Sequence, residues 1–105
     1  MNFAAIDVQI QRYVDDHFPG WVECGFIDAE GHEHIFVEKA PVISAENLFP
    51  DSVYPRQGFI NCEVEKTWVD DAGRLLALVN TKGPWSIEST AGATQFVVLA
   101  SQIKE

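Results

Sequence analysis

Two histidines separated by one residue come closest to a metal-binding motif in this 105-residue sequence. Residues two apart in a β-strand project from the same face, so His32 and His34 could both reach one ion. Glu30 and Glu38 are the nearby candidates for the third ligand that such a site needs. The segment follows a predicted turn, where polar side chains are expected anyway. We therefore favour a solvated hairpin edge over a metal site, and we predict no cofactor.

Other groups suited to acid–base or nucleophilic chemistry lack the partners that catalysis needs. His17 has no nucleophile beside it in the sequence, and we favour a structural place for it at the end of a helix. The adjacent acids Asp15-Asp16 and Asp70-Asp71 are expected to point apart. Glycine-rich phosphate loops and the common hydrolase motifs are absent from the sequence. We predict no catalytic residues and favour a protein that is not an enzyme.

Binding residues are easier to nominate. Tyr54-Pro55-Arg56-Gln57 joins an aromatic side chain to one of the few cations, and Trp85 lies further along the chain. Tyr, Trp and Arg carry much of the energy of protein interfaces. Tyr54, Arg56 and Trp85 are therefore the candidate binding residues. They would either contact a protein partner or, together with His34, line a small-molecule pocket in which Arg56 holds an anionic group. In the plainer interpretation, Tyr54 only pins its loop to the body of the protein.

The charge balance limits the partners. The formal net charge is −9, from 16 acids against 7 bases, and the bases are spread singly along the chain. Binding to nucleic acid or to an anionic membrane depends on clustered Lys and Arg. Both are therefore disfavoured, and a basic protein partner fits better.

The sequence also indicates a compartment. It begins Met1-Asn2-Phe3 without a basic region, and no apolar run approaches the ~20 residues of a membrane span. We expect a soluble, cytoplasmic protein. In a reducing cytosol, Cys24 and Cys62 are expected to be buried free thiols, and a disulfide between neighbouring strands is the alternative.

The elements that must position these residues begin with a predicted helix over residues 3–17. At 100° per residue, one face of that helix gathers most of its apolar side chains. These residues are Phe3, Ile6, Ile10, Tyr13, Val14 and His17. Pro19-Gly20 would end the helix.

From residue 21 the apolar spacing changes to every second position, which is typical of strands. Six strands are expected, from residue 21 to the turn at 28–31, then over 33–39, 58–69, 74–80, 85–88 and 95–101. The strand at 74–80 is apolar on both faces and should be central. Residues 40–57 form a long connection with three prolines and at most one helical turn, near 44–48. Connections of this length are usually functional or poorly ordered.

Together these elements predict one domain, residues 1–105, of the α+β class but mostly β. The amphipathic helix would pack on a six-stranded antiparallel sheet that closes partly or fully into a barrel, and an open sheet is the alternative. The predicted core is Ile6, Ile10, Val22, Phe26, Ile60, Cys62, Val64, Leu76, Leu78, Phe96 and Val98.

Three short segments resemble a known family. They are Lys39-Ala40-Pro41-Val42-Ile43-Ser44, Tyr54-Pro55-Arg56-Gln57-Gly58-Phe59 and the closing strand over 92–103. They are similar to the C-terminal β-barrel of the elongation factor Tu group of translation factors, over about a third of the chain. That family's loop reads Tyr-Arg-Pro-Gln, and the middle two residues are exchanged here. No GTPase domain accompanies the segments, so the resemblance implies a partner-binding barrel without nucleotide hydrolysis, and the net charge argues against the family's RNA binding.

We therefore expect a small acidic interaction module with a basic protein partner, using the connection at 40–57 as its variable surface. An inhibitor or immunity-type protein is one specific form. The alternative is a small-molecule-binding protein or minor enzyme, with a pocket between that connection and the sheet.

Overall fold

The N-terminal segment is a β-strand, and the predicted helix over residues 3–17 is wrong. In the computed structural model, which describes residues 2–105, β1 runs over Asn2–Asp15. Its side chains alternate between the two faces of the sheet: Ala4, Ile6, Val8 and Ile10 are buried, and the residues between them face outward. The fold is therefore almost entirely β, and no amphipathic helix covers the sheet.

Long-range pairing explains why the strand forms in place of the helix. β1 pairs antiparallel with β4 without interruption from Asn2↔Val64 to Ile10↔Arg56. The β-branched side chains of Ile6, Val8 and Ile10 suit a pleated, half-buried surface. A local helix would have buried Ile6 and Ile10 but left Val8 on the other face.

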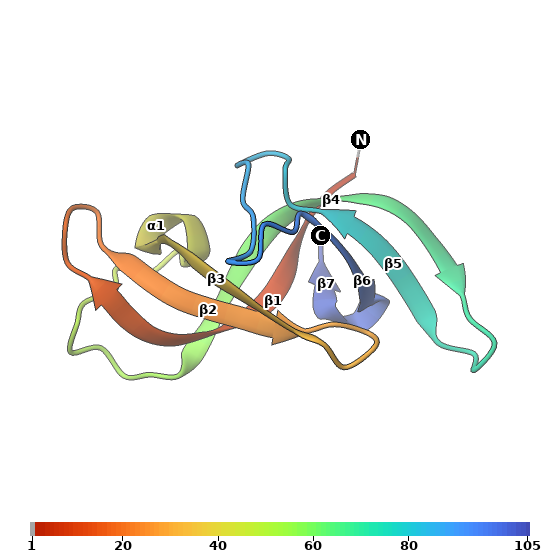
Figure 1. Ribbon diagram of the computed structural model, residues 1–105, viewed down its shortest axis with the longest axis horizontal. Helices are drawn as coiled ribbons and strands as arrows, with labels where there is room; N and C mark the ends of the chain where they lie inside the picture. The colour runs from red at the N-terminus through yellow and green to blue at the C-terminus, as the bar shows by residue number, and fades with distance from the viewer. Residues whose placement is uncertain (1) are drawn as a thin grey trace.

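Seven strands form one antiparallel sheet in the order β3-β2-β1-β4-β5-β6, with β7 paired to β1 (Figure 1). The elements after β1 are β2 (Trp21–Ile27), β3 (Glu33–Lys39), α1 (Ala40–Ile43), β4 (Arg56–Val69), β5 (Leu75–Asn80), β6 (Gln95–Leu99), the 3-10 turn η1 (Ala100–Gln102) and β7 (Ile103–Lys104). β5, predicted to be central, lies between β4 and β6 and is one strand from the edge of the sheet.

The predicted strand at 85–88 is wrong as well, because those residues belong to a loop between β5 and β6. Pro84 lacks the N–H that a ladder needs, and Ser86 has a φ of 54°, which no strand residue adopts. β1 takes the place of this missing strand among the six that form the continuous sheet.

The sheet curls into a half-barrel whose outer strands, β3 and β6, approach each other (Figure 1). Two backbone hydrogen bonds link them through neighbouring turns: Thr90 N–H donates to Ile35 O at 2.8 Å, and Ala29 N–H to Val97 O at 3.0 Å. The Phe36 and Phe96 rings fill the space between the strands, with centroids 5.7 Å apart. Such contacts cover edges that would otherwise be free to pair with another chain.

The core lies on the inner face of this half-barrel. Val64 and Leu78 of the predicted core are half-buried, and every other predicted member is buried. The connection at 40–57 contributes Ile43 and Leu48 to the core, which pins it to the sheet. Its helical turn is α1, directly after β3, and the predicted position near 44–48 is wrong. Among the described residues, no helix has the length and apolar character to cross a membrane.

Two valine substitutions of identical chemistry distinguish the strand from the predicted helix. Val8 is 4% exposed and lies outside the helical stripe, whereas Val14 is 38% exposed and lies within it. We expect Val8→Ala to lower the free energy of unfolding by about 2 kcal/mol, and Val14→Ala by less than about 1 kcal/mol. Urea titration followed by tryptophan fluorescence measures both. A larger loss for Val14→Ala than for Val8→Ala would contradict the strand.

Candidate functional site

Both histidines of the β2–β3 hairpin face one carboxylate, that of Asp28. His34 Nε2 lies 2.7 Å from Asp28 Oδ2, and His32 Nδ1 lies 3.7 Å from the same oxygen. Asp28 Oδ1 accepts the backbone N–H groups of Glu30 and His32 at 2.9 and 3.0 Å. The His34 ring packs edge-on against Phe96 at 4.7 Å. Asp28 thus ties His34 and the backbone of the turn together.

These hydrogen bonds set the ionisation of Asp28. Burial alone would raise the pKa of this carboxyl, but hydrogen bonds from the His34 side chain and from the backbone of His32 and Glu30 lower it below its ordinary value of 3.8. The turn is therefore organised around an ionised carboxylate.

A second cluster of polar ligand atoms lies at the end of β1. One ligand atom from each of Asp15, Asp16 and His17 falls within 4.8 Å of the others, and all three residues are exposed. The prediction that Asp15 and Asp16 point apart is therefore wrong. His17 donates its backbone N–H to Asp15 Oδ1 at 2.9 Å, and its Nδ1 lies 2.6 Å from the same oxygen. These hydrogen bonds lower the pKa of Asp15 and raise that of His17. The cluster is a surface turn that closes on itself.

Two of the three predicted binding residues hold the connection at 40–57 in place. The Tyr54 hydroxyl donates to Phe49 O at 2.8 Å. Arg56 donates to Glu46 Oε1 at 3.0 Å. Arg56 also borders a groove of about 580 Å³ over the outer face of β1, β2 and β3. A binding role for Tyr54 and Arg56 stays a prediction, and their contacts within the chain match the plainer interpretation.

Trp85, the third predicted residue, does not join them. It lies in the loop between β5 and β6 and is 59% exposed. That loop is at the top of Figure 1, whereas the segment with Tyr54 and Arg56 is at its lower left. The fold therefore separates Trp85 from Tyr54 and Arg56.

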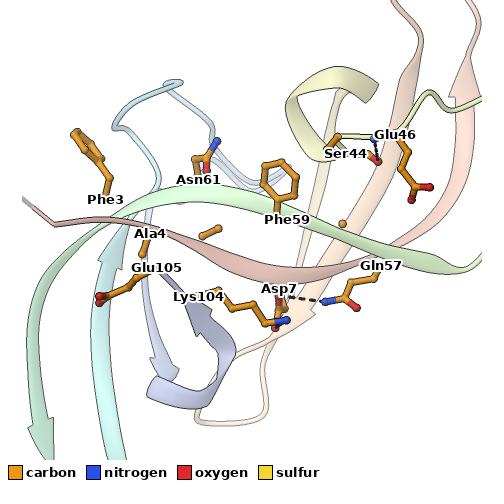
Figure 2. Close-up of a pocket in the computed structure, with 13 residues that line it drawn as sticks. Phe3, Ala4, Asp7, Ser44, Glu46, Gln57, Phe59, Asn61, Lys104 and Glu105 are labelled. Carbon is orange, nitrogen blue, oxygen red and sulfur yellow. Dashed lines mark hydrogen bonds and ion pairs between the residues drawn. The ribbon is translucent and has the colours of Figure 1, made fainter.

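A groove of about 660 Å³ does lie between the connection and the sheet, on the outward faces of β1 and β4. Figure 2 shows Ser44 and Glu46 of the connection at one side of it and Lys104 and Glu105 at the other. Phe59 stands between them, and neither Tyr54 nor Arg56 lines this space. We call it the β1–β4 groove.

Three of the polar side chains that line the β1–β4 groove contact one another. Asp7 accepts a hydrogen bond from Gln57 Nε2 at 3.3 Å, and its other oxygen lies 3.5 Å from Lys104 Nζ (Figure 2). Asp7 therefore bridges β4 and β7 across β1. Sequence reasoning missed Phe59, although the alternation that placed Ile60 inside also placed Phe59 outside.

The cysteines are buried free thiols, as predicted. Cys24 on β2 is opposite Ile10, and Cys62 on β4 is opposite Ala4, so β1 lies between the strands that carry them. Burial raises the pKa of Cys24 to about 12 and that of Cys62 to about 11. Neither thiol is poised as a nucleophile.

No protein-family model, curated protein or solved structure matches the chain. The resemblance to the elongation factor Tu barrel therefore stays a prediction, and function is argued from the surface and charges of the molecule itself.

The paired carboxylate of Asp28 predicts a specific pH dependence of stability. Its pKa is lower in the folded protein than in the unfolded chain. The stabilisation that the ionised Asp28 carboxylate gives the fold is therefore complete at a pH above its pKa in the unfolded chain. It is lost as the pH falls through its pKa in the folded protein. We expect Asp28→Asn to cost about 1–2 kcal/mol near pH 5, and the difference from wild type to shrink below about pH 4. Guanidinium titrations from pH 5 to pH 2 measure it. The exposed Asp71→Asn is the control, and a difference that stays constant to pH 2 would contradict this account.

Proposed function

We propose that the protein is an acidic interaction module, not an enzyme, and that its partner is a basic protein. The observation that carries the proposal is that most basic side chains already contact groups of the same chain, whereas many acidic side chains do not. Six of its bases are already in contact with acids or aromatic rings of the same chain. The ion pairs are Arg12–Glu23, Arg56–Glu46, Arg74–Asp70 and Lys104–Asp7, and the cation–ring contacts are Lys39–Trp21 and Lys66–Trp68.

Many acids have no such partner. Among residues 2–105, the carboxylates outside any ion pair are Asp16, Glu33, Glu38, Asp51, Glu63, Glu65, Asp71, Glu88 and Glu105. Lys82 is the one base of this part of the chain outside the contacts above. The unbalanced charge is thus negative, which attracts a positive partner over several ångströms and speeds association.

Two further points support the proposal. The resemblance to the elongation factor Tu barrel implies partner binding through a β-scaffold, and an inhibitor or immunity-type role suits the small size and the charge. We further propose a cytoplasmic location, with which two buried free thiols agree.

Affinity isolation from an extract of the native cells, followed by calorimetry with the purified partner, tests the proposal. We expect a basic protein that binds one to one, with a Kd that rises about tenfold between low and moderate salt because ions screen the attraction. Recovery of no partner at low salt, or a partner whose affinity does not depend on salt, would contradict it.

A second candidate function rests on the β1–β4 groove. Its volume of about 660 Å³ falls within the range of small-molecule sites, and it lies between the connection at 40–57 and the sheet. Phe59 offers a ring against which a flat apolar group can pack. Under this alternative the protein binds a metabolite there.

A thermal-shift screen against metabolites separates the two functions. A ligand of the β1–β4 groove should raise the melting temperature by several degrees at saturation. The shift should be lost in Phe59→Ala and kept in Gln11→Ala, an exposed position on β1. A screen without any shift removes this candidate and leaves the interaction module.

A further inference from the structure

Two exposed phenylalanine side chains line one groove. Phe18, in the turn between β1 and β2, is 96% exposed, and Phe49, in the connection at 40–57, is 57% exposed. Both line a cavity of about 590 Å³ whose floor includes Leu48 and Ala40. We call it the Phe18–Phe49 groove. Ser44 and Glu46 separate it from the β1–β4 groove, because they line both.

The turn that carries Phe18 is held firmly. Asp15 Oδ1 accepts the His17 N–H at 2.9 Å, and His17 O accepts the Gly20 N–H at 2.7 Å. Gly20 has a φ of +92° and lies under the Tyr13 ring, where a Cβ would meet the Tyr13 hydroxyl oxygen at 2.0 Å. Gly20 O then accepts the Ala40 N–H at 2.8 Å. Phe18 is therefore presented on a backbone that is fixed on both sides.

Phe49 is fixed in the same way. Its N–H donates to Ser52 Oγ at 2.9 Å. Its carbonyl accepts the Ser52 N–H at 3.0 Å and the Tyr54 hydroxyl at 2.8 Å. An exposed ring on a held backbone loses little conformational entropy when it binds. Tyr54, predicted from the sequence as a contact residue, acts here by fixing Phe49.

The charged side chains that line the groove are acidic. Asp16 and Glu46 line it, and no lysine or arginine does so among the described residues. Asp15 lies beside Asp16 within the turn. Glu46 is held by Arg56, which leaves Asp16 as the unpaired carboxylate at the rim. An apolar floor with a negative rim suits a ligand that is apolar in one part and cationic in another.

We propose that the Phe18–Phe49 groove is the docking surface for a short basic segment of a partner protein. An apolar side chain of the segment packs between the two rings, and a neighbouring lysine or arginine pairs with Asp16. This inference rests on the proposed function, because it assigns the surface through which the acidic module takes its basic partner. Exposed aromatic side chains that line a groove are typical of interaction sites.

Selection from a phage-displayed library of random 12-residue peptides, with the immobilised protein as bait, tests the surface without knowledge of the natural partner. We expect enriched peptides with a net positive charge and at least one large apolar residue. Fluorescence anisotropy with a labelled enriched peptide then gives affinities for the variants. The double variant Phe18→Ser/Phe49→Ser should lose at least about tenfold in affinity, and Asp16→Asn about threefold.

Matched controls come from exposed apolar residues outside the groove. Val53 is 80% exposed in the same connection, and Trp85 is 59% exposed in another loop. Val53→Ser and Trp85→Ser should bind like the wild type, and all variants should keep its melting temperature. Basic peptides that bind the double variant undiminished would overturn this docking surface and leave the proposed function standing. A selection that enriches no basic peptide would contradict both.

Discussion

The rest of the structure depends on the pairing of β1 along both of its edges. On one edge, residues 2–10 pair with β4, and on the other, residues 9–15 pair with β2 while Ala5 and Ile6 pair with β7. Gln9 and Ile10 pair on both sides at once. Without this strand, the β2–β3 hairpin and the β4–β5–β6 meander would be two small sheets, each too limited to bury the core that they share.

This pairing also decides where binding surfaces can form. The outward side of the β1–β4 ladder carries Phe59, and the connection at 40–57 crosses beside it to make one groove. Where β1 turns back into β2, Phe18 of the turn and Phe49 of the connection line another. The inner side of the ladder is filled by core residues such as Ile6 and Ile60. The binding surfaces that we propose therefore lie on the outside of the half-barrel.

The sequence predicted most of the strands but not the first one, and the reason is physical. Ile6 and Ile10 satisfy both a helical stripe and a strand face, because four residues are two strand repeats and about one helical turn. Val8, buried between them, and the β-branched character of all three favoured the strand, but the partner that stabilises it lies about fifty residues away. The candidate site was equally hard to foresee. An aromatic residue such as Phe18 suggests a core position, and only the fold shows that it is exposed.

Nuclear Overhauser contacts in β1 test the central claim most directly. We expect cross-strand contacts between the α-protons or amides of the partners Ala4 and Cys62, Ile6 and Ile60, and Val8 and Gly58, together with Ile10 and Cys24 on the opposite edge. Strong amide–amide contacts between successive residues over 3–15, with α-proton to amide contacts three residues apart, would show a helix there and contradict the account.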